Sequence, residues 1–222
     1  MGDRAVGLHF NSYNGGGVAS IQQHLEAHAG HINFYQETKC LKDKSEEKEG
    51  YLFASNLKSC WTPATIKNTK PSGGAAIVLP AWLDCWVTGA CELWSGRVVF
   101  CFLRTKLLGT IVLYPVCLEP NSQLKGLNLQ MLECLWRHAV AHGLPCLLAG
   151  DWNMLPAILF EFLPSGLRIV YDTQHVYGCS ATANNTLDYF VVDHRLYRMI
   201  SMIGTNVAWP ATPRRPVYSK NG

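Results

Sequence analysis

Short apolar runs with polar residues at their ends recur along the 222-residue chain and are its most constraining feature. Runs of this kind, rich in Val, Ile and Phe and bounded by glycine, are residues 75–79, 98–103 and 110–114. Residues 144–149 are wholly apolar and lead to Asp151, and residues 187–192 form another such run, which contains Asp188. Such runs are typical of strands buried in packed sheets. They predict an α/β fold with two packed β-sheets, helices outside, and the polar ends gathered along one edge.

Helical spacing of apolar residues predicts two helices that cover these sheets. Residues 18–29 follow a run of glycines and carry apolar side chains at intervals of three and four. Ser122 is a suitable N-cap for a second helix, which should end at Gly143. Residues 41–50 are dominated by Lys and Glu, and we expect them to form a solvated surface loop.

The composition excludes several classes of protein. Apolar residues make up 48% of the chain and charged residues 16%, which excludes a disordered or fibrous protein. The formal net charge of +3 is too small to identify a nucleic-acid partner and does not exclude one. For this length we expect a single domain over residues 1–222, and a monomer.

The nine cysteines lie mostly in apolar runs and include no Cys-x-x-Cys pair. This pattern favours reduced, buried thiols over a secreted disulfide framework or a clustered zinc site. The chain begins without an apolar leader, and it contains no apolar stretch of about 18 residues. We therefore expect an intracellular protein, cytoplasmic or nuclear, with no membrane segment.

Several motifs occur in the order found in one superfamily. They are Asn11, Gln36-Glu37-Thr38, the run 73–77, Tyr114, Gly150-Asp151-Trp152-Asn153 and Leu187-Asp188-Tyr189-Phe190. In these motifs the chain resembles the endonuclease/exonuclease/phosphatase superfamily, and within it the abasic-endonuclease-like branch and the endonuclease domains of non-LTR retrotransposons. The resemblance covers about residues 6–218 and implies a DNase I-like four-layer α/β sandwich. It also implies Mg²⁺-dependent hydrolysis of phosphodiesters in nucleic acid, DNA in particular.

The resemblance implies a site for Mg²⁺, with Mn²⁺ as a substitute. Phosphodiester hydrolysis needs a hard cation that neutralises phosphoryl oxygens, and one or two carboxylates suffice to hold it. Glu37 lies at the C-terminal end of a short predicted strand over residues 31–38 and is the expected metal ligand. Asn11 is expected to help place the metal or the phosphate. Asn14, three residues later and also before glycine, is the alternative to Asn11.

Four further residues take catalytic roles by the same resemblance. Asp151 orients or deprotonates the attacking water, and Asn153, the next residue but one, donates to a phosphate oxygen. Tyr114 ends a strand before proline, and its hydroxyl would contact the scissile phosphate. Asp188 orients a histidine and fixes its tautomer. We expect all these side chains to meet in one pocket.

The C-terminal motif departs from the superfamily pattern. Members normally close with Ser-Asp-His, whereas this chain has Pro213 and Arg214 at the positions of the aspartate and the histidine. An arginine stays protonated and offers only donors, so it cannot accept a proton from water. Two hypotheses follow: a metal-dependent nuclease of reduced activity, or a catalytically silent, retrotransposon-derived copy that only binds nucleic acid or a partner.

Two other groupings have simpler interpretations. A phosphatase or lipid phosphodiesterase of the same fold would need an exposed apolar loop, and residues 155–163 fit a packed helix equally well. His24, His28 and His31 resemble a metal cluster, but Glu26 falls on another helical face from the first two. We expect these histidines to face solvent.

Overall fold

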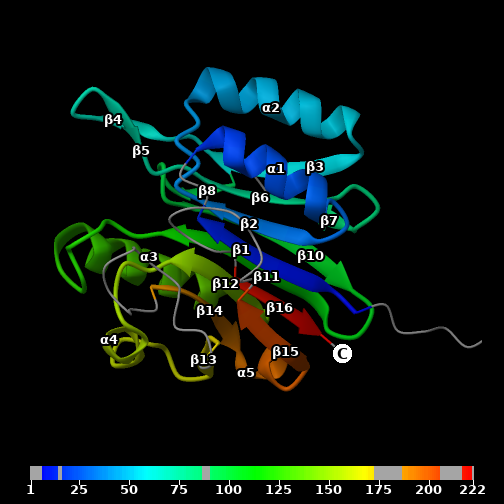
Figure 1. Ribbon diagram of the computed structural model, residues 1–222. Coiled ribbons are helices and arrows are strands. Elements are labelled where there is room, and N and C mark those ends of the chain that lie inside the picture. The colour runs from blue at the N-terminus through cyan, green and yellow to red at the C-terminus, as the bar shows by residue number, and fades with distance from the viewer. Residues whose placement is uncertain (1–6, 15–16, 87–90, 173–186, 206–216, 222) are drawn as a thin grey trace, which may run out of the picture.

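The computed structural model describes residues 7–14, 17–86, 91–172, 187–205 and 217–221. Within these residues, two β-sheets pack face to face and carry helices on their outer sides (Figure 1). The predicted four-layer α/β sandwich is therefore confirmed.

The first sheet has six strands among the described residues, in the order β15-β16-β1-β2-β6-β3. Their bounds are β1 His9–Asn14, β2 Ile32–Gln36, β3 Leu57–Thr62, β6 Ala75–Pro80, β15 Ile200–Thr205 and β16 Val217–Asn221. β1 and β2 run parallel, and the other neighbouring pairs run antiparallel. Consequently, the C-terminal ends of β1 and β2 lie at the same edge of this sheet.

The second sheet follows the order β13-β14-β12-β11-β10-β7, with β9 paired to β11 and β8 to β9. Its strands are β7 Cys85–Trp86, β8 Glu92–Trp94, β9 Val98–Val99, β10 Cys101–Thr105, β11 Gly109–Cys117, β12 Cys146–Asp151, β13 Leu167–Val170 and β14 Asp188–Asp193. β11 and β12 are parallel, whereas β14 is antiparallel to β12. The C-terminal ends of β11 and β12 therefore meet the first residue of β14. A separate ribbon pairs β4, Thr65–Lys67, with β5, Lys70–Ser72.

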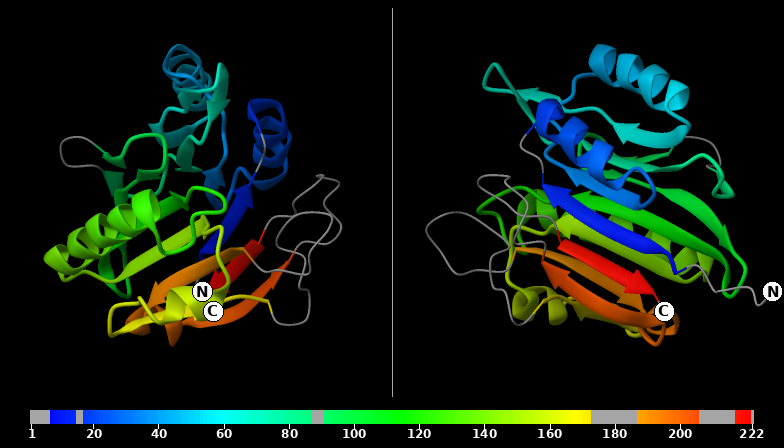
Figure 2. Two further views of the ribbon diagram at one scale, coloured as in Figure 1. Left: turned by 90° about the vertical axis from the view of Figure 1, so that its left-hand side faces the viewer. Right: turned by 45° about the vertical axis from the view of Figure 1, so that its right-hand side comes forward.

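Helices cover both outer faces of this pair of sheets (Figure 2). Their bounds are α1 Val18–His28, α2 Lys42–Ala54, α3 Gly126–His142, α4 Pro156–Phe160 and α5 His194–Tyr197. α1 and α2 share an apolar cluster with the first sheet, and α3 and α4 share another with the second. None of the described helices combines the length and apolar character needed to span a lipid bilayer.

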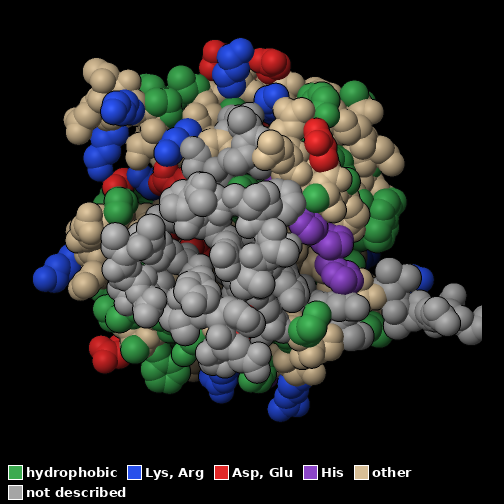
Figure 3. All heavy atoms as spheres, viewed as in Figure 1, with side chains coloured by type: hydrophobic (Ala, Val, Ile, Leu, Met, Phe, Trp, Pro, Cys, Tyr) green, Lys and Arg blue, Asp and Glu red, His purple; other side chains and the backbone are tan. Residues whose placement is uncertain are grey.

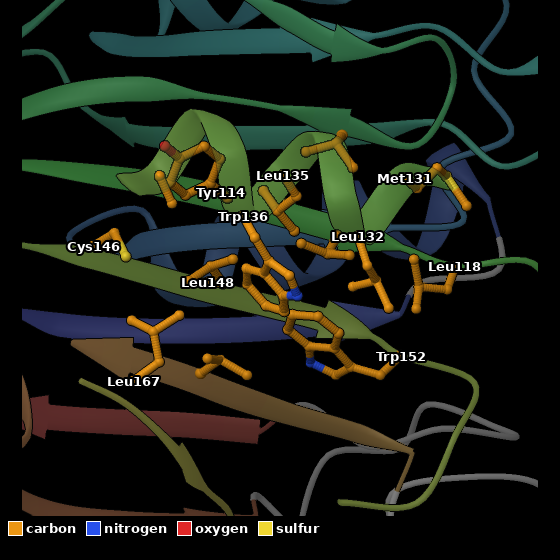
Figure 4. Close-up of a cluster of buried hydrophobic side chains, with 14 of the residues drawn as sticks. Tyr114, Leu118, Met131, Leu132, Leu135, Trp136, Cys146, Leu148, Trp152 and Leu167 are labelled. Carbon is orange, nitrogen blue, oxygen red and sulfur yellow. The ribbon is translucent and has the colours of Figure 1, made fainter. Parts of the chain in front are cut away.

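Alternation along the strands assigns each side chain to the layer between the sheets or to a helix-covered face. Along β12, Leu147 and Ala149 belong to the cluster between the sheets. Cys146 and Leu148 instead belong to the cluster beneath α3, which Figure 4 shows in close-up. Asp151 continues the inward set and ends the strand, so the strand directs its carboxylate toward the edge between the two sheets.

The solvated loop predicted for residues 41–50 is wrong, because most of this segment belongs to helix α2. Lys and Glu are good helix formers, and Lys44 and Glu47 form an i,i+3 ion pair of 2.9 Å on the exposed face. Leu52 buries the last turn of the helix against the first sheet. The Lys- and Glu-rich composition of residues 41–50 therefore reflects the solvent-exposed face of a helix and not a loop.

The second predicted helix is confirmed, but its start differs. α3 begins at Gly126 after Lys125, so Ser122 does not cap it. The predicted end is correct: Gly143 is the C-cap, with a φ of 59° that suits glycine. Residues 155–163 include the short helix α4, whose Leu159 is buried in the apolar cluster under α3.

Gly150 is a position at which the packing of the second sheet can be tested. A methyl group on Gly150 would lie 2.5 Å from the Val116 carbonyl oxygen and 2.9 Å from Val116 Cβ. We expect Gly150→Ala to lower the free energy of unfolding by about 1–3 kcal/mol, as overpacking does. Gly50→Ala, on helix α2 with no described atom within 4 Å of its new methyl, should instead stabilise by about 0.5–1 kcal/mol. Urea unfolding measures both effects, and a change of the same sign in the free energy of unfolding of the two variants would contradict this expectation.

Candidate active site

Polar residues from both sheets meet at one edge of the layer between them. Asn14 ends β1 and, in register, lies beside Gln36 at the end of β2. On the second sheet, Asp151 at the end of β12 lies beside Cys117 on one side and Asp188 on the other. The Asn14 Nδ2 atom donates a 2.6 Å hydrogen bond to Asp151 Oδ2, which joins the two sheets at this edge.

Two carboxylates are buried next to one another here. Asp151 and Asp188 are 1% and 4% exposed, and their Cα atoms are direct partners in the antiparallel pairing of β12 with β14. Burial, and then the charges of Asp188 and Asp151, raise the pKa of the hydroxyl of the neighbouring Tyr189. The edge therefore places two carboxylates side by side in a buried setting.

Glu37 follows β2 directly and is held in a left-handed backbone conformation, with φ at 51°. The segment after it is anchored on the glycine pair: Thr38 N–H donates to the Gly74 carbonyl at 3.1 Å, and Lys39 N–H to the Gly73 carbonyl at 2.9 Å. Non-glycine residues in this conformation persist only where surrounding contacts impose it, and they cluster at functional sites. The Glu37 side chain keeps 20% of its surface exposed, so one side faces solvent.

Arg97 is a buried cation placed against Glu37. Its guanidinium, on a side chain only 5% exposed, lies 3.5 Å from Glu37 Oε1 and also pairs with Glu119. The Ser72 hydroxyl accepts a further hydrogen bond of 3.3 Å from the same guanidinium. Because arginine presents a planar, permanently charged fork of donors, Arg97 fixes the orientation of the Glu37 carboxylate.

Cys117 ends β11 and lies between Glu37, to which its thiol hydrogen-bonds, and Asp151, its partner in β12. Its thiol donates to Glu37 Oε1 across 3.4 Å. Burial first, and then the charges of Glu37 and Asp151, raise the pKa of this thiol well above its ordinary value. Cys117 is therefore a protonated donor to Glu37 and not a thiolate nucleophile.

The turn after β12 is fixed by hydrogen bonds to neighbouring strands. Asn153 has a φ of 49°, and its Nδ2 atom donates to the Leu118 carbonyl at 2.8 Å. The indole of Trp152 is fully buried and donates to the Tyr189 carbonyl at 2.9 Å. These contacts hold the turn beside Asp151 and use one of the two N–H groups of the Asn153 amide nitrogen.

The oxygen donors at this edge suit a hard cation. A magnesium ion keeps several waters and needs only one or two carboxylates. Glu37 and Asp151 can supply carboxylate oxygens, and Asn14 can supply an amide oxygen. Among the described residues, no group of three or more His, Cys, Asp or Glu side chains is arranged to hold a metal ion by itself. The oxygen donors at this edge are of the type that a hard cation such as Mg²⁺ prefers.

Comparison with solved structures identifies the fold. The chain superposes on the catalytic domain of Xenopus laevis APE2 with a TM-score of 0.73 and 14% identity, over 96% of this chain and 92% of that one. The endonuclease domain of TRAS1, a telomere-specific non-LTR retrotransposon, gives 0.72 and 13%, over 97% and 98%. The AP endonuclease of Leishmania major gives 0.70 and 16%, over 97% and 87%. The chain has the fold of the endonuclease/exonuclease/phosphatase superfamily.

No protein-family model and no curated protein matches the chain. The fold that the motif resemblance implies is confirmed by the solved structures. Of the six predicted site residues, the structure brings four to the edge between the sheets: Glu37, Asp151, Asn153 and Asp188.

Asn11 does not lie at this edge, which corrects its predicted placement. Its Nδ2 atom is 2.9 Å from both Asn33 Oδ1 and His31 Nδ1, on the α1 side of the first sheet. Asn14 is three residues further along β1, and an odd offset places it on the opposite face of the strand. Asn14, the alternative weighed from the sequence, is the residue that contacts Asp151.

Tyr114 is displaced for the same reason. It lies three residues before the end of β11 and points away from the edge, into the cluster beneath α3 (Figure 4). Its hydroxyl is 2.9 Å from His138 Nδ1 on that helix, and burial raises the pKa of the hydroxyl well above its ordinary value. Cys117 stands at the strand end where Tyr114 was expected.

The predicted solvent-facing histidines are only partly exposed. His24 is fully buried and hydrogen-bonds Tyr35 at 3.0 Å, whereas His28 and His31 are half-buried beside it. Histidine side chains gather on one face of the molecule in Figure 3. Burial first, and then the charges of His28 and His31, lower the pKa of His24 to about 3, so it is neutral at physiological pH.

Three residues at the edge were not foreseen as site residues: Arg97, Cys117 and Glu119. Strand parity would have favoured Cys117 over Tyr114, since Leu113 is in the inward set and Cys117 shares its parity. Nothing local marks Arg97 or Glu119, because their contacts join segments distant in sequence. Pro213 and Arg214 lie outside the described residues.

Proposed function

We propose that this chain is a Mg²⁺-dependent phosphodiester hydrolase that acts on nucleic acid, DNA in particular, at a reduced rate. The observation that carries the proposal is the hydrogen bond from Asn14 to Asp151, which joins the two sheets where Glu37 and Asp188 also lie. Such a convergence of carboxylates and amides can hold a hard cation and place a water against a phosphate.

Glu37 is the metal ligand in this proposal, assisted by the side-chain oxygen of Asn14. When bound, the cation would neutralise charge on the phosphoryl oxygens and stabilise the leaving alkoxide. Arg97 and Cys117 act on Glu37 as positioning residues, through their hydrogen bonds to Oε1.

Asp151 accepts the proton of the attacking water, and the Asn14 amide, which donates to Oδ2, holds its carboxylate in place. Asn153 contacts the phosphate from the turn after β12. In the sequence, Arg214 stands where the superfamily has the histidine that Asp188 would orient. A missing general base commonly costs about 10²- to 10⁴-fold in rate, which is the reason for proposing reduced activity.

Proteins of this fold support DNA as the substrate. The Neisseria 3′ phosphatase NExo has been solved bound to a product DNA hairpin, and it covers 97% of this chain at a TM-score of 0.68 and 14% identity. The TRAS1 and Leishmania proteins are endonucleases by name. At such low identity these likenesses support the substrate class and leave strand preference to experiment.

Asn14 and Asn11 form a matched pair for testing the site. Asn14→Ala removes the hydrogen bond to Asp151 and should lower cleavage of a labelled DNA duplex by up to about 10²-fold, because misplaced catalytic groups lose rate steeply. Asn11→Ala changes the opposite face of β1 and should leave the rate within about twofold. Thermal melts check that both variants are folded. Equal cleavage rates for the two variants would show that Asn14 is not part of the active site.

Glu37→Gln tests the metal ligand directly. We expect the Mg²⁺ concentration for half-maximal cleavage to rise at least about tenfold, as happens when a metal site loses a supporting group. Mg²⁺ or Mn²⁺ should also raise the melting temperature of the wild type but not that of the variant, because ligand binding stabilises the folded state. Glu47→Gln, on the exposed face of α2, is the control. Identical metal dependence in both variants would refute the assignment.

A second candidate function is a catalytically silent, retrotransposon-derived copy that only binds nucleic acid or a partner. The Pro213-Arg214 departure and the absence of Tyr114 from the edge favour it. Binding of a labelled duplex without any cleaved product, at every Mg²⁺ and Mn²⁺ concentration, would establish this function in place of the first.

A further inference from the structure

Four cysteines from separate segments meet away from the candidate active site. Cys60 lies on β3, Cys85 on β7, Cys91 just before β8 and Cys101 on β10. The thiols of Cys91 and Cys101 both hydrogen-bond to Cys60, and Cys101 also contacts Cys85. All four are free thiols: Cys101 belongs to the cluster between the sheets, and the other three pack against it.

Cys60 and Cys91 are held together by their surroundings. The Cys91 thiol lies 3.8 Å from the carbonyl oxygen of Trp61, the residue after Cys60. One residue further along each segment, the Thr62 hydroxyl donates to Glu92 Oε2 at 2.5 Å. Cys60 and Cys91 are partly exposed residues, whereas Cys101 is fully buried within β10.

The cluster also makes its members unequal in reactivity. Hydrogen bonds from the Cys101 and Cys91 thiols lower the pKa of Cys60 and outweigh its burial, which acts in the opposite direction. The hydrogen bond to Cys60 and burial raise the pKa of Cys91. Because the thiolate is the nucleophile in thiol chemistry, these hydrogen bonds favour Cys60 over Cys91 as the attacking thiol.

We propose that Cys60 is a modification site for small-molecule disulfides, of which oxidised glutathione is the type, and that Cys91 is its resolving thiol. The proposal rests on the contacts among these thiols and is independent of the hydrolase activity. Cys91 lies outside the strands and its thiol already hydrogen-bonds to Cys60, whereas Cys101 belongs to the β10–β11 pairing.

The chemistry balances in two exchange steps. The Cys60 thiolate attacks one sulfur of glutathione disulfide, a mixed disulfide forms, and one glutathione thiolate leaves. Cys91 then loses its proton to water and attacks the Cys60 sulfur, which forms the Cys60–Cys91 disulfide and releases the second glutathione. Two protein thiols are oxidised and one glutathione disulfide is reduced to two glutathione molecules.

Peptide mapping of the native full-length chain tests this proposal. The protein is incubated with oxidised glutathione, quenched in acid, alkylated and digested, and each cysteine is followed by mass spectrometry. We expect a Cys60–Cys91 disulfide in the wild type, and an accumulated glutathione adduct on Cys60 in Cys91→Ser. Cys60 should react at least about tenfold faster than Cys134, a half-buried thiol on α3 outside the cluster.

Two results would overturn the proposal. One is a Cys134 that reacts as fast as Cys60 in the wild type, a comparison that needs no variant to fold. The other is oxidation that joins Cys60 to Cys101 instead of Cys91. Cys85→Ser serves as the control within the cluster, and it should keep the wild-type pattern because the hydrogen bond of Cys85 is to Cys101.

Discussion

Asp151→Asn is expected to lower the rate of DNA cleavage by about 10²- to 10⁴-fold while the chain stays folded. The amide keeps the shape of the carboxylate and can still accept the hydrogen bond from Asn14, but it cannot take a proton from water. Single-turnover rates at saturating Mg²⁺ measure the effect, and melting curves confirm the fold.

Asp193→Asn is the matched control for this substitution. Asp193 is a buried aspartate at the far end of β14, where it caps α5 and pairs with Arg195 at 2.8 Å. Its replacement should lower the melting temperature and leave the cleavage rate nearly unchanged. If the two variants lose rate equally, the loss reflects general destabilisation, and Asp151 has no special role in proton transfer.

The second large effect concerns the C-terminal departure, in residues outside those that the structure describes. Restoring the superfamily pattern with Pro213→Asp and Arg214→His should raise the cleavage rate, by about tenfold or more, toward the 10²- to 10⁴-fold that a general base supplies. The imidazole can accept a proton, which a guanidinium cannot. Both changes are needed because each superfamily residue has its own role at the phosphate.

Asp188 provides the control for that recovery. It is buried beside Asp151, and in the superfamily pattern it would fix the tautomer of the restored histidine. Adding Asp188→Ala to the double variant should therefore cancel the gain. If the wild type already cleaves DNA rapidly and Arg214→Ala leaves that rate unchanged, a different group performs the proton transfer.

The layer architecture could be predicted because each core strand is a local pattern. The wholly apolar run before Asp151 forms β12, and the run containing Asp188 forms β14. Helix α2 could not be predicted from hydrophobic periodicity, since Leu52 is its one buried large apolar residue, whereas Tyr51 and Phe53 are exposed. Its helical state reflects intrinsic propensity and packing on β3, which composition does not report.

The candidate site was predictable only as far as strand ends were placed correctly. Asn11 and Tyr114 each lie three residues before the end of their strand, and an odd offset reverses the face on which a side chain lies. Applying that parity to the sequence leads to Asn14 and Cys117 instead. The Arg97 guanidinium could not have been assigned this way, because its contacts with Glu37 and Glu119 exist only after folding.

Single-turnover cleavage by the wild-type chain separates a slow enzyme from a binding protein most directly. Enzyme in excess over end-labelled plain and abasic duplexes is incubated with millimolar Mg²⁺ or with EDTA, and products are resolved over hours. A convergent site built on Glu37, Asn14 and Asp151 predicts slow cleavage that requires Mg²⁺ and disappears in Asp151→Asn. Bound but uncut duplex in Mg²⁺, or equal cleavage in EDTA, would contradict a metal-dependent hydrolytic site at this edge.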